Sequence, residues 1–68
     1  LNRIIKEITG LSLHQYIIKL RIHEAIHLLQ HSHLSISEIS EKVGYNNHQY
    51  FSRIFKKKVG HPPSYFRV

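Results

Sequence analysis

The chain has 68 residues, enough for one small domain with a thin hydrophobic core, because apolar residues make up 41% of it. It has no cysteine, which excludes disulfide bonds and thiolate metal sites, and no apolar run approaches the roughly 20 residues that span a bilayer. The net charge is +6, and all four acidic residues precede residue 42, so the last part of the chain is purely basic. This distribution suits a polyanion such as nucleic acid, although an ordinary solvated basic surface explains it equally well.

The first predicted element is the end of a helix over about residues 1–10. Its apolar residues recur at the i, i+3, i+4 and i+7 spacing of one helix face: Leu1, Ile4, Ile5 and Ile8. Gly10 is placed to end this helix as a C-terminal glycine. Because the chain begins with leucine rather than methionine, we expect it to be a piece of a longer protein.

A long helix is predicted from a cap at Ser12 to about Gln30. In its N-terminal half the apolar residues share one side: Leu13, Tyr16, Ile17 and Leu20. In its C-terminal half they gather on nearly the opposite side: Ile18, Ile22, Ala25, Ile26 and Leu29. A helix on a single core keeps one stripe, so this pattern predicts a strut with a separate small core at each end.

A short helix is predicted after a loop over residues 31–34. Ser35 and Glu38 have the spacing of a capping box, in which each side chain bonds to the backbone of the other residue. The apolar residues that follow give the helix one buried face: Ile36, Ile39 and Val43. We expect the helix to end at Gly44, where glycine can take the positive φ of a tight turn.

The last long helix is predicted to begin after a cap at Asn47 and to end at Gly60. Its apolar residues again share a face: Phe51, Ile54, Phe55 and Val59. The proline pair at 62–63 suits the start of a helix, so a final turn is expected over residues 64–67.

Two helices joined by a tight turn have the ingredients of a helix-turn-helix. The second of these helices, at about residues 48–59, has polar residues opposite its phenylalanines: Gln49, Ser52, Arg53 and Lys56. Glutamine can pair with adenine and arginine with guanine in the major groove, so Gln49 and Arg53 are the predicted readers of base edges.

The other candidate contacts follow from position. His48 lies in the first turn, which enters a groove first. Lys56 and Lys57 are predicted to contact phosphate, as is the amide-rich start of the preceding helix at Ser37. An amphipathic helix with an ordinary solvated face explains the same pattern, so the pattern alone favours neither interpretation.

Several stretches of the chain are similar to the pattern of one known protein family. In the second half the matching residues are 35–39, 43–45, 50–57, Gly60 and Pro63. In the first half they are Leu1, Arg3, Lys6, Gly10, Tyr16, Leu20, Arg21, Ala25, Leu28 and Leu29. With these residues the chain resembles the C-terminal DNA-binding domain of the AraC/XylS family of transcription regulators.

The resemblance implies an all-α fold of the homeodomain-like helix-turn-helix type, with two units joined by a long helix. Residues 1–10 are then the end of the first recognition helix, 11–31 the linker helix and 32–68 the complete second unit, all within one DNA-binding domain. It also places Asn2 and Arg3 on the first reading helix.

On the second reading helix the resemblance places the residues His48, Gln49, Tyr50 and Arg53. The position of Tyr50 is ambiguous, because its ring lies between the buried and the reading face. The chain departs from the family in lacking the bracing helix and turn of the first unit, which puts half of the DNA footprint in doubt. Further departures are Ile5 for phenylalanine, Ser40 for alanine and Phe66 for tyrosine; Ser40 is expected to fit the contact between helices.

A metal site is the rival interpretation. Residues 23–27 spell H-E-x-x-H, in which two histidines bind zinc and the glutamate serves as base, and His31 extends the spacing. Seven histidines make a chance match easy, and no convincing third ligand follows, although Glu38 and Glu41 are present. We therefore disfavour a zinc hydrolase and leave adventitious surface metal binding open.

The sequence thus predicts a sequence-specific DNA-binding domain of a bacterial transcription regulator, without catalysis or cofactor. Its expected partner is double-stranded DNA, and the resemblance adds RNA polymerase as a partner of the full-length regulator. An effector is expected to bind only a domain outside this chain. We expect a cytoplasmic location and no membrane partner, and we disfavour an interaction or membrane-surface bundle that uses the basic face.

Overall fold

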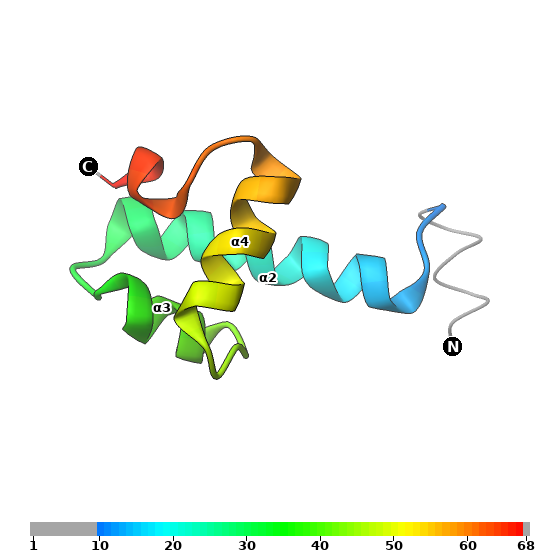
Figure 1. The fold of residues 1–68 in the computed structure, drawn as a ribbon, viewed down its shortest axis with the longest axis horizontal. Coiled ribbons are helices and arrows are strands. Elements are labelled where there is room, and N and C mark those ends of the chain that lie inside the picture. Colours follow the sequence, from blue (N-terminus) through cyan, green and yellow to red (C-terminus); the bar gives the residue numbers. More distant parts are fainter. Residues whose placement is uncertain (1–9, 68) are drawn as a thin grey trace.

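The computed structural model describes residues 10–67, which form three α-helices and one 3-10 helix (Figure 1). They are α2 (Leu13–His31), α3 (Ile36–Lys42), α4 (His48–Val59) and η1 (Pro63–Phe66). The described residues contain no strand, so this part of the chain is all-α as predicted. The predicted helix end at the N-terminus, with Asn2 and Arg3, lies outside the described residues.

The long helix α2 begins after the predicted cap Ser12, which forms a capping box with Gln15 that the sequence analysis did not predict. The Ser12 hydroxyl accepts a hydrogen bond from the Gln15 backbone amide at 3.2 Å, and the Gln15 side chain accepts one from the Ser12 amide at 3.1 Å. These two bonds satisfy amide groups that the first turn of a helix otherwise leaves without partners.

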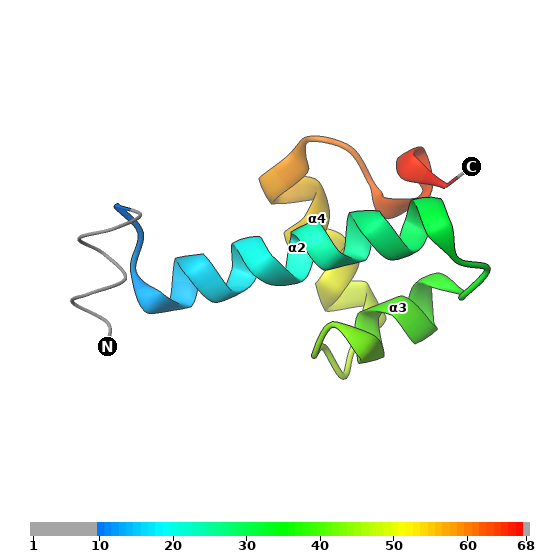
Figure 2. The same ribbon diagram turned by 180° about the vertical axis from the view of Figure 1, so that it is seen from behind.

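The C-terminal half of α2 packs against the other helices, whereas its N-terminal half projects beyond them (Figures 1 and 2). The stripe of the C-terminal half is buried at Ile22, Ala25 and Leu29. In the N-terminal half, Ile17 and Leu20 are 37% and 50% exposed. One of the two expected cores therefore exists in the described part of the chain, and the other stays a prediction.

The short helix α3 also begins at its predicted capping box. The Ser35 hydroxyl accepts from the Glu38 amide at 3.1 Å, and the Glu38 carboxylate accepts from the Ser35 amide at 2.9 Å. The helix ends at Lys42, two residues before the predicted end, because Val43 already leaves the helical conformation at φ −90° and ψ 2°. Gly44 then makes the turn at φ 106°, a region that residues with a Cβ seldom adopt.

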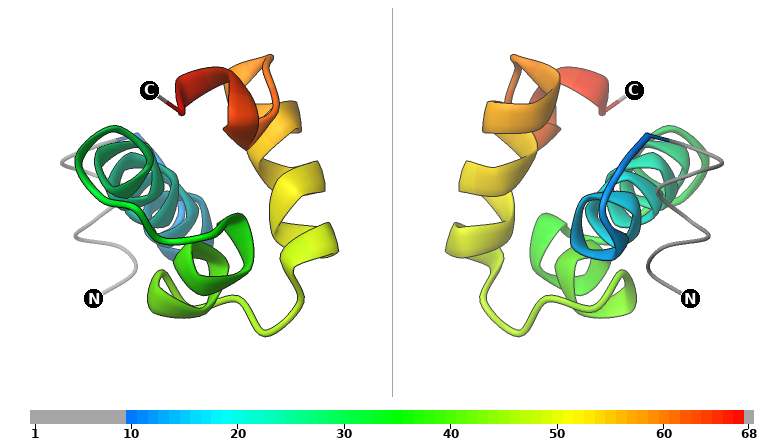
Figure 3. Two further views of the ribbon diagram at one scale, coloured as in Figure 1. Left: turned by 90° about the vertical axis from the view of Figure 1, so that its left-hand side faces the viewer. Right: turned by 90° about the vertical axis from the view of Figure 1, so that its right-hand side faces the viewer.

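Helix α4 crosses α2 and α3, as the views along the long axis show (Figure 3). Its aromatic residues Phe51 and Phe55 are completely buried, and they form the centre of the single core in the described part of the chain. The rest of the buried core comes from α2, α3 and the turn: Ile22, Ala25, Leu29, Ile39, Val43 and Tyr45.

The C-terminal 3-10 helix closes this core. Gly60 ends α4 at φ 93°, and η1 begins at the buried Pro63. The ring of Phe66 meets the ring of Phe55 edge-on, with their centroids 5.7 Å apart. Edge-to-face pairs of this kind add to the free energy gained by burial.

Ser40 is the buried polar residue of the core region, and it is 1% exposed. Its hydroxyl has two acceptors in reach, the carbonyl oxygens of Ser37 at 2.9 Å and of Tyr45 at 3.5 Å. The small side chain therefore fits the contact between helices, as expected, without a lost hydrogen bond.

No helix among residues 10–67 is long and apolar enough to cross a membrane.

Candidate nucleic-acid interface

Helix α4 has one buried and one exposed face. Phe51 and Phe55 are buried in the core, whereas Gln49, Arg53 and Lys56 are exposed. At about 100° per residue, these three positions lie on the side of the helix away from the two phenylalanines. The predicted outward orientation of Gln49 and Arg53 is thus confirmed, while contacts of these residues with bases stay predictions.

The N-terminal end of α4 is fixed by Asn47. Its side-chain oxygen accepts hydrogen bonds from the backbone amides of Gln49 at 2.9 Å and Tyr50 at 3.1 Å. His48 is the first residue of the helix and is exposed there, as expected for a side chain that meets a ligand first. Ser52, the fourth predicted polar contact, is half-buried at the border between the two faces.

Tyr50 also lies at this border. The residue is 50% exposed, and its ring centroid is 6.0 Å from that of Tyr45 in the preceding turn. One side of the ring therefore packs against the domain while the rest faces solvent, which accounts for its ambiguous position in the sequence pattern.

The turn before α4 is held by a contact that the sequence pattern does not reveal. The guanidinium carbon of Arg21, in α2, lies 4.9 Å from the centroid of the Tyr45 ring, and that ring lies 5.6 Å from the ring of Phe51. A guanidinium over an aromatic face is attracted by the negative charge of the ring face. Arg21 and Tyr45 are 24 positions apart in the sequence. A pattern within one helix or turn does not indicate that two such distant residues are in contact.

The basic residues of the last part of the chain do not all belong to one surface. Lys56, Lys57 and Lys58 are exposed in the last turn of α4, where the helix dipole also favours positive charge. Arg67 instead donates hydrogen bonds to the backbone carbonyl oxygens of Ser32, at 2.9 Å, and of Leu34. Its charge therefore ties the loop between α2 and α3 to the C-terminal segment.

The start of α3 is less favourable for phosphate than the sequence suggested. Ser37 is exposed there, as predicted, but Glu38 lies beside it in the same first turn. Hydrogen bonds from the backbone amide and then the side chain of Ser35 lower the pKa of the Glu38 carboxyl below its ordinary value. The lowered pKa keeps the negative charge of Glu38 to lower pH, and this charge is unfavourable for a phosphate at this helix end.

The residues of the H-E-x-x-H motif are exposed to solvent. His23, Glu24 and His27 are exposed on α2, and no group of three or more metal-ligating side chains occurs within residues 10–67. A catalytic zinc centre uses three protein ligands in a shaped site. The described part of the chain therefore gives the hydrolase alternative no support.

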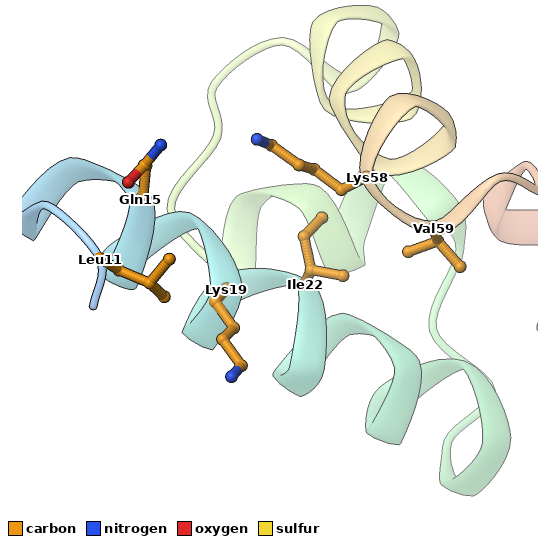
Figure 4. Close-up of a pocket in the computed structure, with 6 residues that line it drawn as sticks. All are labelled: Leu11, Gln15, Lys19, Ile22, Lys58 and Val59. Carbon is orange, nitrogen blue, oxygen red and sulfur yellow. The ribbon is translucent and has the colours of Figure 1, made fainter. Parts of the chain in front are cut away.

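A groove of about 280 Å³ lies between the N-terminal half of α2 and the end of α4 (Figure 4). Its lining combines aliphatic and amine side chains: Leu11, Gln15, Lys19, Ile22, Lys58 and Val59. Figure 4 shows the Lys58 side chain reaching across toward Gln15, whereas the Lys19 amine points away. None of these six side chains is a carboxylate, thiol, hydroxyl or imidazole, so the ionisable groups of the lining are the amines of Lys19 and Lys58.

The chain is similar to known proteins in both sequence and structure. A family described as a helix-turn-helix domain matches residues 1–68. The chain is 46% identical over 59 residues to the transcriptional activator RhaR of Salmonella arizonae, covering 87% of this chain and 21% of that protein. It thus spans about a fifth of the length of the curated relatives that it matches.

Two solved structures share the fold over 97% of this chain. One is the C-terminal domain of AraT, a response regulator from Geobacillus stearothermophilus, with a TM-score of 0.89, 41% identity and 55% of that chain covered. The other is the DNA-binding domain of the transcription factor AdpA in complex with a target DNA, with a TM-score of 0.88, 26% identity and 60% of that chain covered.

Proposed function

The chain belongs to the helix-turn-helix domain family of AraC-type regulators, and from this membership we propose that it is the sequence-specific DNA-binding domain of a bacterial transcription regulator. Support comes from a similar domain that was solved on its target DNA and from a relative that is a transcriptional activator. The observation that carries the proposal is the exposure of Gln49 and Arg53 on the side of α4 away from the buried Phe51 and Phe55.

In the proposed mechanism α4 enters the major groove, which at about 12 Å is wide enough for a helix. The buried phenylalanines hold the helix rigidly on α2 and α3, so that its outer side chains keep a fixed register against the bases. Arg53 donates two hydrogen bonds to the acceptors of a guanine, and Gln49 pairs with an adenine. His48 and Ser52 contact the groove at its edges.

Phosphate contacts position this helix but carry no sequence information. We assign them to Lys56 and Lys57, which are exposed in the last turn of α4. Ser37 is a weaker candidate, because the ionised Glu38 lies beside it. Asn2 and Arg3 remain predicted contacts of a first reading helix, with residues 11–31 as the linker between two units.

The remaining roles concern a longer protein. We infer that the full-length regulator contacts RNA polymerase and that any effector binds a domain outside this chain. We also infer that the domain has no catalytic activity, since its relatives are transcription regulators. A peptidase activity that is lost in Glu24→Gln would overturn this last inference.

Selection of binding sites from a pool of random duplexes tests the proposed function. We expect one enriched motif whose affinity falls with salt by about 0.9 log units per log unit for each phosphate contacted. A domain that merely has a solvated basic surface enriches no sequence, and that result would contradict the proposal.

A further inference from the structure

Three histidines follow one another along α2 at intervals of four residues. His23, His27 and His31 are all exposed, and none belongs to the core or to the proposed DNA-contacting face of α4. The rings of His27 and His31 are in contact, with centroids 4.7 Å apart and planes 39° from parallel. No such ring contact joins His23 to His27 in the part of the chain that the structure describes.

The separation of the two rings is compatible with a shared metal ion. An ion held about 2.0–2.1 Å from one nitrogen of each ring, at an angle of about 90–110°, puts the ring centroids about 4.5–5.2 Å apart. The observed 4.7 Å lies within this interval. The distance between the two rings therefore permits one shared ion, once a nitrogen of each ring is turned toward it.

Their place on the helix also favours a cation. His31 is the last residue of α2, where backbone carbonyl groups without helical partners leave a partial negative charge. The guanidinium of Arg67, bound to the carbonyl oxygen of the following Ser32, offsets part of this charge. His27 lies about 200° around the helix from the buried Ala25, on the side away from the core. Both His27 and His31 are exposed to solvent, and in Figure 2 α2 lies in front of α4.

We propose that His27 and His31 form a two-histidine chelate for one divalent transition-metal ion, with water completing the coordination shell. Neutral imidazole suits zinc, copper and nickel ions, whereas magnesium and calcium prefer oxygen ligands. The bound ion connects the last two turns of α2 and limits fraying where the helix meets the loop to α3. This site is independent of the proposed DNA-binding function.

Titration of the untagged chain with Zn²⁺ at about pH 7.5 tests the proposal by calorimetry, because imidazole binds metal in its neutral form. We expect one ion per chain and a weakening of at least about tenfold in His27→Gln and in His31→Gln, since each removes a ligand. His23→Gln is the matched control, because it lies on the same helix at the same spacing and should leave the affinity unchanged. Circular dichroism of each variant verifies that the helices are retained.

The alternatives give different results. If His23→Gln and His27→Gln weaken binding while His31→Gln does not, the ion is held by another pair and the proposal is wrong. If all three variants bind like the parent, or if the parent takes up no ion, the ring contact between His27 and His31 is not a metal site.

Discussion

The guanidinium of Arg21 covers the ring of Tyr45, with its central carbon 4.9 Å from the ring centroid. The same guanidinium lies against Gly44, where a Cβ built on the backbone would stand 3.1 Å from that carbon. Arg21, in the middle of α2, therefore packs against the turn that precedes α4. The turn before α4 is thus packed by a contact between segments far apart in the chain.

Gly44→Ala should destabilise the domain by about 1–3 kcal/mol, because alanine is strained at φ 106° and its methyl group would crowd Arg21. Chemical denaturation measures the loss. Gly60→Ala is the matched control, since φ is also positive there, at 93°. A Cβ at Gly60 would have no atom within 4 Å, so this variant should lose only the stability that backbone strain costs. A Gly44→Ala variant as stable as the parent would show that the turn is not constrained in this way.

Tyr45→Phe should leave the domain as stable as the parent, or more stable by up to about 1 kcal/mol. The Tyr45 hydroxyl is buried and has no hydrogen-bond partner among the described residues, whereas the ring packs against Arg21 and Phe51. Tyr45→Leu, which removes the ring as well, should be clearly destabilising. Thermal unfolding distinguishes the two, and a large loss in Tyr45→Phe would mean that the hydroxyl does form a stabilising bond.

Arg67→Met should cost about 1–3 kcal/mol, because it removes the donors to the carbonyl oxygens of Ser32 and Leu34. Lys57→Met removes the same charge from an exposed position of α4 and should change the stability by less than about 0.5 kcal/mol. Urea denaturation of both variants makes the comparison. Equal stability of the two would show that Arg67 acts only as a surface charge.

The capping box of α3 should make part of the stability depend on pH. The pKa of Glu38 is lowered in the folded chain, so its contribution is present above the ordinary glutamate pKa and is lost as the pH falls through the lowered value. The difference in melting temperature between the parent and Glu38→Gln should therefore shrink between about pH 6 and pH 3. Glu41→Gln, in the same helix but away from its N-cap, serves as control, and a difference for Glu38→Gln that stays constant with pH would contradict the assignment.

The local features of the fold were predictable from the sequence. Ser12, Ser35 and Asn47 each bind backbone amides two or three residues ahead, so a short pattern contains the whole interaction. The helix period likewise predicted that Phe51 is buried and Arg53 exposed. Both kinds of prediction depend only on geometry within one helix.

The contacts between distant segments were not predictable. Arg67 binds carbonyl groups 33 and 35 residues away, and a single sequence does not tell which segments meet. The predicted end of α3 at Gly44 is two residues late, because Val43 belongs to the apolar pattern of the helix and is buried in the core, yet it lies outside the helix. The apolar pattern predicts which residues are buried, but it does not tell whether a buried residue belongs to the helix.

The most direct test compares Arg53→Ala and Lys57→Ala on the selected duplex and on random duplexes. We expect Arg53→Ala to lose about 1–3 kcal/mol on the selected duplex and to relax the preference at one base position. Lys57→Ala should weaken both kinds of duplex alike, because phosphates are the same in each. If Arg53→Ala binds every duplex as well as the parent does, α4 does not read bases through its exposed face.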